Sequence, residues 1–181
     1  MAVIRPFECV RPQAEKAERV AALPYDVYNR EEACREVARE PLSFLKIDRA
    51  ETQFDSSVDT YAPEVYAKAK ELLENAIADG TFIKDSEQAY YIYELTMDGR
   101  VQTGLVACAS IDDYESNVIK KHENTRAEKE QDRICHVDIC DAQTGPIFLA
   151  YRANEQIGQA VEACMKNAPL YDLKREDGTR H

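Results

Sequence analysis

The chain has 181 residues, of which 44% are hydrophobic, and a formal net charge of −11 at pH 7. This length allows one domain, or one domain and a small appendage, with a buried core. The acidic balance argues against a nucleic-acid partner, because neutralising phosphates requires a basic face. No apolar run approaches the roughly 20 residues that a membrane span needs, and the first residues lack the pattern of a signal peptide, so we expect a cytoplasmic protein with no membrane partner.

The first forty residues are predicted to form short elements followed by one well-defined helix. We expect a strand over residues 3–10, a short helix over 13–23 and a turn over 24–27. Asn29, followed three positions later by Glu32, has the form of a capping box, so a helix should begin there and end before Pro41.

The next segment contains the strongest helical pattern in the chain. Residues 44–47 read as a short buried strand, and 48–57 as a polar loop. From about 62 to 79, apolar residues recur at helical spacing, with Pro63 in the first turn and Gly80 at the expected C-terminal cap. This spacing predicts a helix that buries one face in the core.

After this helix the spacing of apolar residues changes to the alternation that is typical of β-strands. Residues 89–97 and 100–110 are predicted to form a hairpin around Asp98-Gly99, a favourable turn sequence. We expect a helix over 126–141, a buried strand over 147–151 and a last helix over 154–167. The predicted fold class is therefore α/β (α+β), a mixed sheet with hairpins and several flanking helices.

The end of the chain resembles an interrupted hairpin. Residues 170–176 alternate like a strand and Asp177-Gly178 suggests a turn, but only residues 179–181 remain for the returning strand. We expect the front part of a longer protein, with an α/β domain over 1–152 and the start of a following segment over 153–181. A frayed natural terminus is the alternative.

The six cysteines are scattered, with no Cys-x-x-Cys pair, which is typical of small buried hydrophobic residues. Cys135, His136 and Cys140, with His122 nearby, could supply metal ligands. Adjacent residues point to different sides of a helix, however, so Cys135 and His136 would not converge, and we expect no structural zinc.

A charged loop ahead of the predicted helix 126–141 is the main candidate site. Thr125 and Glu128 have the spacing of a capping box, with Thr125 as the N-cap. A helix N-terminus favours phosphate or carboxylate, and the nearby basic side chains would strengthen that field. The candidate anion-binding residues are Lys120, Lys121 and Arg126, and the candidate proton-handling residues are His122 and Glu123. The alternative is a solvated loop that flanks a capped helix.

Five motifs follow one another along the chain. They are Arg5-Pro6-Phe7, Pro24-Tyr25-Asp26-Val27, Ile119-Lys120-Lys121-His122-Glu123, Asp132-Arg133 and Asp141-Ala142-Gln143-Thr144-Gly145-Pro146. In this order they cover nearly the whole chain, which resembles the prokaryotic proteins of domain-of-unknown-function family ten-fifteen. Members of that family look considerably longer than this chain.

The resemblance implies an activity that composition does not. Later in such proteins is an Asp-Gly-His-His-Arg type motif, absent here, that looks like the phosphate-contacting motif of ParB and sulfiredoxin relatives. Some ParB-like proteins are kinases of free serine. The resemblance therefore implies a ParB/sulfiredoxin-like fold and a nucleotide-dependent phosphotransferase that uses ATP or ADP with magnesium on a small hydroxyl metabolite such as free serine.

In that hypothesis Lys120, Lys121 and Arg126 hold phosphate oxygens, Glu123 accepts the proton of the attacking hydroxyl, and His122 orients it. The pocket would also include Tyr25, Asp26, Thr144 and Gly145. Neither common kinase loop occurs in the chain. A non-catalytic nucleotide- or anion-binding regulatory module is the alternative, and the net charge disfavours a ParB-like nucleic-acid binder.

Overall fold

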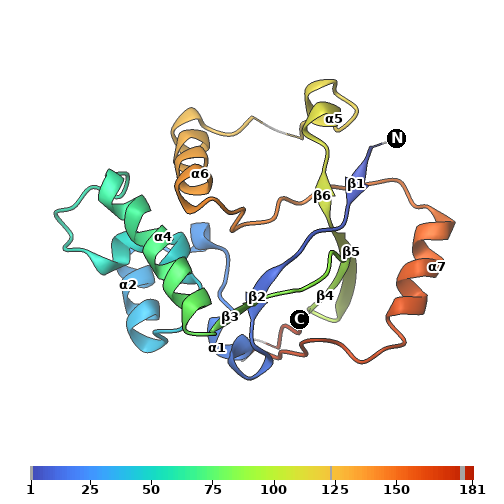
Figure 1. The fold of residues 1–181 in the computed structure, drawn as a ribbon, viewed down its shortest axis with the longest axis horizontal. Coiled ribbons are helices and arrows are strands. Elements are labelled where there is room, and N and C mark those ends of the chain that lie inside the picture. Colours follow the sequence, from blue (N-terminus) through green and yellow to red (C-terminus); the bar gives the residue numbers. More distant parts are fainter. Residues whose placement is uncertain (1, 123, 176–177) are drawn as a thin grey trace. The chain divides into compact units, whose positions relative to one another are not determined.

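The computed structural model describes residues 2–122, 124–175 and 178–181, and these form two compact units (Figure 1). Unit 1 contains Met1–Ala14, Lys84–Glu123 and Phe148–His181, and unit 2 contains Glu15–Ile83 and Asn124–Ile147. The described residues form seven α-helices and small two-stranded sheets, which confirms the predicted α/β class. The predicted single mixed sheet is wrong, because among these residues the strands pair only two by two. No helix among them is long and apolar enough to cross a lipid bilayer.

Unit 2 is helical. Its α-helices are α1 (Ala17–Val20), α2 (Arg30–Arg39), α3 (Leu45–Asp48), α4 (Pro63–Ala78) and α6 (Ala127–Cys140). Two further segments, Tyr25–Val27 and Ala50–Gln53, form 3₁₀ turns between them.

The predicted capping box of α2 is confirmed. The Asn29 side chain accepts a hydrogen bond from the Glu32 amide at 3.0 Å, and the Glu32 carboxylate accepts one from the Asn29 amide at 2.9 Å. Two backbone donors that the helix itself cannot pair are thus satisfied. The helix ends at Arg39, before Pro41, as predicted.

The core of unit 2 forms around the predicted stripe of α4. This helix buries Val65, Ala69, Leu73 and Ala76 against residues from α3, the following 3₁₀ turn and α6. The other buried members of this cluster are Val20, Ile47, Ala50, Phe82 and Cys140. Burial of this apolar surface holds α6 against α4 and so determines the direction in which the polar face of α6 points.

Three sequence-based predictions in or next to unit 2 are wrong. Residues 45–47 belong to helix α3, with Phe44 as its N-cap, and not to a strand, although Leu45 and Ile47 are buried as expected. The N-cap of α6 is Arg126 and not Thr125, and Arg126 makes no side-chain cap. Residues 147–151 form no strand, and Phe148 is 80% exposed, so the apolar run there is not part of the core.

Unit 1 holds short strands and two helices. Strand β1 (Ile4–Arg5) pairs antiparallel with β6 (Cys108–Ala109), and β4 (Tyr91–Met97) pairs with β5 (Arg100–Val106). The remaining elements are β2 (Val10–Pro12), α5 (Ile111–Glu115) and α7 (Glu155–Cys164), while the division of the chain into units falls within β3 (Phe82–Lys84). The predicted strand over 3–10 is thus divided in two.

The β4–β5 hairpin turns at the predicted Asp98-Gly99. Both residues have positive φ, 51° and 75°, the left-handed conformation that this dipeptide tolerates. Near the end of the chain, Arg180 bridges to both Lys174 and Thr96, so residues 179–181 do pair with residues 173–175. The predicted turn residue Asp177 lies outside the described residues, and the boundary after residue 152 stays a prediction.

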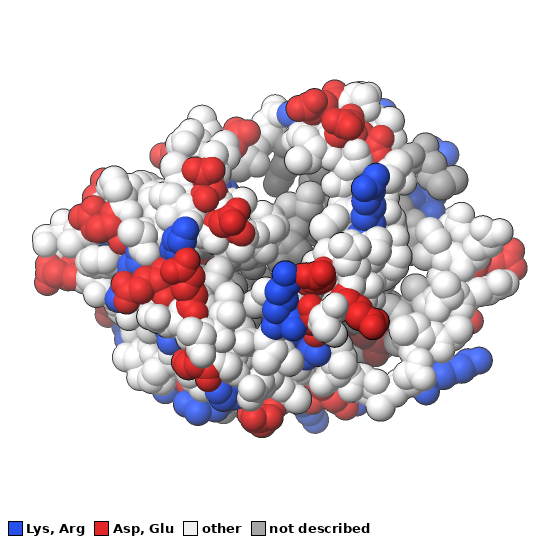
Figure 2. All heavy atoms as spheres, viewed as in Figure 1, with Lys and Arg blue, Asp and Glu red and all other residues white. Residues whose placement is uncertain are grey.

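Acidic side chains are interspersed with basic ones on the face that Figure 2 shows, in keeping with the net charge of −11.

Candidate functional site

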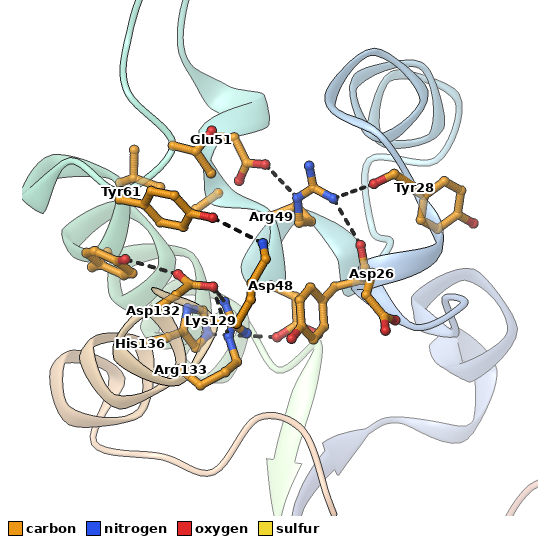
Figure 3. A pocket seen from close by; sticks show the side chains of 15 residues that line it. Asp26, Tyr28, Asp48, Arg49, Glu51, Tyr61, Lys129, Asp132, Arg133 and His136 are labelled. Atoms are coloured by element: carbon orange, nitrogen blue, oxygen red, sulfur yellow. Dashed lines mark hydrogen bonds and ion pairs between the residues drawn. The ribbon is translucent and has the colours of Figure 1, made fainter. Parts of the chain in front are cut away.

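Unit 2 contains a pocket of about 220 Å³ (Figure 3). Its lining comes from the 3₁₀ turn Tyr25–Val27, the end of α3, the 3₁₀ turn Ala50–Gln53, the start of α4 and one face of α6. Helix α6 contributes Lys129, Asp132, Arg133 and His136. These positions are three, four and seven residues apart, so they share one face of the helix, and the core contacts of α4 hold that face in place.

A carboxylate and an imidazole meet in this pocket without a direct hydrogen bond. His136 Nε2 lies 3.8 Å from Asp48 Oδ1, and the His136 side chain is only 3% exposed. Thr144 Oγ1, in the loop after α6, donates a hydrogen bond of 3.1 Å to Asp48 Oδ1. Among the described residues, His136 Nε2 has no hydrogen-bond partner.

Burial changes the protonation of both groups. Desolvation raises the pKa of Asp48 to about 6, although the Thr144 hydrogen bond and the charge of Arg133 oppose the shift. Desolvation, with the charge of Arg133, lowers the pKa of His136 to about 4. Near pH 7 the pair is therefore a carboxylate beside a neutral imidazole and not a salt bridge.

A second buried carboxylate orients the guanidinium in the pocket wall. Asp132 accepts a hydrogen bond from Tyr66 Oη at 3.0 Å and pairs with Arg133 at 3.0 Å. Arg133 in turn lies over the ring of Tyr25, with its central carbon 4.4 Å from the ring centroid, within the range of a cation–π contact. Arg133 is thus fixed by a carboxylate and an aromatic face.

Arg49 holds the turn that carries Tyr25. Its guanidinium donates hydrogen bonds to the backbone oxygens of Tyr25, at 2.9 Å, and Tyr28, at 2.8 Å. Its Nε atom pairs with Glu51 Oε1 at 2.5 Å, and the Glu51 side chain is 3% exposed. This buried ion pair therefore fixes one wall of the pocket (Figure 3).

Lys129 lies at the N-terminal end of the α6 face. Its Nζ donates a hydrogen bond of 3.1 Å to Tyr61 Oη and lies 5.6 Å from the centroid of the Tyr61 ring. The hydrogen bond to Tyr61 raises the pKa of Lys129, so the amine stays charged. Within the described part of the chain, Lys129 forms no ion pair, which leaves it available to an anion.

These groups suit a small polar ligand. Lys129 and Arg133 provide positive charge, and Asp48 and His136 provide a proton acceptor and a hydrogen-bonding nitrogen. Over residues 2–122, 124–175 and 178–181, no three His, Cys, Asp or Glu side chains gather as a metal site.

The four predicted pocket residues all belong to unit 2, but only two of them line the pocket. Tyr25 and Asp26 line the pocket. Thr144 contacts it through Asp48, while the Gly145 backbone oxygen accepts a hydrogen bond from the Gln143 side chain. The ligand-binding roles assigned to these residues stay predictions.

The predicted anion loop belongs largely to the other unit. Lys120, Lys121 and His122 are in unit 1, where Lys121 Nζ lies 5.0 Å from the centroid of the Tyr114 ring, and Arg126 is the N-cap of α6 in unit 2. Glu123, the predicted base, lies outside the described residues. Their catalytic and phosphate-binding roles also stay predictions.

The most informative residues of the pocket were not predicted. Asp48 was placed at the start of a polar loop, and His136 was weighed only as a zinc ligand. Asp132 and Arg133 belong to a motif of the family resemblance, and this was the one sequence signal that pointed to the α6 face. No local pattern links Asp48 to His136, because they are far apart in the sequence and meet only through the packing of α6 on α4.

Comparison with known proteins gives one match. A family model described as "Protein of unknown function (DUF1015)" matches residues 4–181. Searches for similar curated proteins and for similar solved structures found no match.

Proposed function

The chain belongs to the DUF1015 family, whose description states no activity, and we propose a function from the unit 2 pocket itself. We propose that the protein is a nucleotide-dependent phosphotransferase that acts on a small hydroxyl metabolite such as free serine. The pocket is the acceptor site in this proposal. The observation that carries it is the Asp48 carboxylate, which lies beside a buried imidazole whose Nε2, on His136, has no hydrogen-bond partner among the described residues.

The size of the pocket supports a small acceptor. Its volume of about 220 Å³ lies below the roughly 300–1,000 Å³ of pockets that hold drug-sized ligands. A molecule of a few heavy atoms fits such a space. A whole nucleotide does not, so the phosphate donor would present only its terminal phosphate to the pocket.

Asp48 has the properties of a general base. A base works best when its pKa lies near the working pH, and the pKa of about 6 leaves Asp48 mostly ionised at pH 7. In the proposed step, Asp48 accepts the proton of the acceptor hydroxyl as its oxygen forms a bond to the terminal phosphorus. The bond from that phosphorus to the bridging oxygen breaks, and the shortened nucleotide leaves.

The neighbouring cations fit the charge that such a reaction handles. Phosphoryl transfer depends mainly on positioning and on neutralising phosphate oxygens. Arg133 and Lys129 supply positive charge inside the pocket. ATP or ADP with magnesium is the proposed donor, and Arg126, at the start of α6 in the same unit, keeps its predicted role toward the donor phosphates. The roles of Lys120 and Lys121 toward phosphate and of His122 toward the hydroxyl stay predictions from the sequence.

This proposal gives Asp48 the role that the sequence assigned to Glu123, and one experiment separates the two. Transfer of label to free serine is measured from γ-labelled ATP and, in parallel, from β-labelled ADP. The wild-type protein is compared with Asp48→Asn, Glu123→Gln and the control Asp138→Asn, an exposed carboxylate on α6. We expect label on serine from the wild type and the control, and none from Asp48→Asn. Loss in Glu123→Gln alone would return the base role to Glu123, and no transfer by the wild type from either nucleotide would refute the kinase.

A non-catalytic regulatory module is the second candidate, and one observation favours it. Arg49 and Arg133 are both paired with carboxylates, Glu51 and Asp132, so most of the positive charge in the pocket already stabilises the unit. A rigid, preorganised receptor for a nucleotide or an anionic metabolite would look the same. This candidate predicts that ligand binding is unchanged in Asp48→Asn and that the ligand is released unmodified.

A further inference from the structure

We propose that His136 and Asp48 together form a receptor for one ligand hydroxyl group. The pocket should therefore accept small anionic compounds that carry this hydroxyl and reject the same compounds without it. This inference deepens the proposed function, since it concerns the acceptor site, but it is a statement about binding and requires no nucleotide.

The first step is the burial of His136. Its side chain is 3% exposed and lines the pocket, and Nε2 has no hydrogen-bond partner among the described residues. A buried polar atom that stays unpaired is unfavourable, because it has lost its hydrogen bond to water without gaining another. A ligand that pairs with Nε2 recovers that free energy, whereas an apolar ligand group does not.

The second step is the spacing of the two groups. Nε2 and Asp48 Oδ1 are 3.8 Å apart, too far for a direct hydrogen bond. A third atom can lie at about 2.8 Å from both of them, which is an ordinary length for a hydrogen bond. The gap thus matches one polar atom placed to the side of the line that joins Nε2 and Oδ1.

The third step is the donor and acceptor balance. Near pH 7 Asp48 is a carboxylate and only accepts, and neutral His136 presents Nε2 as a donor or an acceptor according to its tautomer. In the tautomer with the proton on Nε2, a hydroxyl can donate to Asp48 and accept from His136, so it satisfies both groups. A methyl group satisfies neither, and an ammonium group, which can only donate, then satisfies Asp48 alone.

The fourth step is the position of the remaining charge. Thr144 holds Asp48 Oδ1 from the side of the loop after α6, which limits rotation of the carboxylate. Arg133, one helical turn before His136, uses Nε and one amino group to bind Asp132. Its other amino group has no hydrogen bond to a described residue and can bind an anionic group of the same ligand.

Discrimination between ligands with and without the hydroxyl should be large, because the Asp48–His136 pair is shielded from water. A site that is built to hydrogen-bond a hydroxyl can reject the analogue without it by as much as about 10⁴–10⁵-fold, since its own polar groups are then left unpaired. One bridging hydroxyl in this pocket should account for at least about 100-fold in affinity.

The test is binding to the full chain, by calorimetry or by NMR titration, with no nucleotide present. L-serine is compared with L-alanine, and 3-hydroxypropionate with propionate, so that each pair differs by one hydroxyl. We expect the hydroxyl member of each pair to bind at least about 100-fold more tightly. The proposal would be overturned if the two members of each pair bound equally, or if none of the four compounds bound. It would also be overturned if serine were preferred over alanine but 3-hydroxypropionate were not preferred over propionate.

Variants assign the discrimination to His136. His136→Phe should remove it, and His136→Gln, which keeps a hydrogen-bonding group, should retain part of it; the second variant keeps the test valid if the first does not fold. Asp138→Asn on the exposed side of α6 is the control. If His136→Phe folds and still prefers the hydroxyl compounds, the assignment is refuted. Selective binding without phosphoryl transfer would refute the proposed kinase and leave this receptor intact.

Discussion

His136 and Asp48 lie 3.8 Å apart in unit 2, and burial has reversed the usual order of their pKa values. The carboxylic acid, with a pKa of about 6, holds its proton to a higher pH than the imidazolium, with a pKa of about 4. The pair is therefore neutral at about pH 5 and carries one negative charge at pH 7. A pair of titratable groups in this state, in a pocket, is characteristic of functional sites.

Replacing Asp48 with Asn should abolish turnover while leaving the fold intact. Loss of a general base costs about 10²–10⁴-fold in rate, and the amide is close in size to the carboxylic acid it replaces. In the wild type, the rate should rise with pH as Asp48 ionises, with a midpoint near pH 6. A pH–rate profile checks this. If the same midpoint persists in active Asp48→Asn protein, another group is the base.

The dependence of stability on pH should reveal both groups. The folded pKa of Asp48 lies above its usual value of 3.8, so its contribution to stability is present below that value and is lost as the pH rises through about 6. The folded pKa of His136 lies below 6.5, so its contribution is present above 6.5 and is lost as the pH falls through about 4. The two slopes oppose each other, so the contributions of Asp48 and His136 should largely cancel in the wild type between about pH 4 and 6.

Single variants separate the slopes. In Asp48→Asn, the free energy of unfolding should rise relative to the wild type by up to about 3 kcal/mol between pH 4 and 6.5, because His136 is then the one member of the pair that titrates. In His136→Gln it should fall by a similar amount between about pH 4 and 6. Urea unfolding at a series of pH values measures both. Parallel curves for the wild type and both variants would contradict the assignment.

Replacing Arg49 with Ala should destabilise unit 2 strongly. The change leaves Glu51 charged and buried and removes the donors to the backbone oxygens of Tyr25 and Tyr28. Breaking a buried pair by removing one partner costs about 3–5 kcal/mol. Chemical unfolding measures the loss, and the double variant with Glu51→Gln should recover part of it, since it removes the unpaired charge but not the unpaired carbonyls. Arg35→Ala, which breaks an exposed pair with Glu31, is the control and should cost well under 1 kcal/mol.

Local signals in the sequence predicted the elements that depend on local physics. The Asn29–Glu32 box and the Asp98-Gly99 turn involve neighbouring residues, and both are confirmed. The stripe of α4 is confirmed for most of its predicted members, but Ile77 at its end is 41% exposed. The apolar run 44–47 was assigned as a strand because a short run has no resolvable period, and the structure makes it part of a helical turn with Ser43 Oγ bonded to the Leu45 amide. The prediction of a strand over residues 147–151 was wrong for a related reason, since apolar composition alone does not supply a neighbouring strand to pair with.

The site was predictable only in its outline. The family motifs named Tyr25, Asp26 and Arg133, all of which line one pocket, and Thr144, which contacts it. Asp48 carried no motif, and its importance arises from burial and from His136, both of which require the packed helices. A raised pKa is a property of the folded environment, so no inspection of the residues around Asp48 in the sequence could have predicted it.

The N-caps of α2 and α6 provide a matched pair of variants. Asn29→Ala removes a formed capping box and should lower the free energy of unfolding by about 1 kcal/mol. Arg126 already has the extended backbone of an N-cap but makes no side-chain bond, so Arg126→Ser should add a cap and raise stability by about 0.5–1 kcal/mol. Urea unfolding of the two variants, measured beside the wild type, should therefore give shifts of opposite sign. The same Arg126→Ser protein tests the predicted phosphate role: weaker nucleotide binding in a more stable protein would support it, whereas unchanged nucleotide binding would restrict Arg126 to its place at the start of α6.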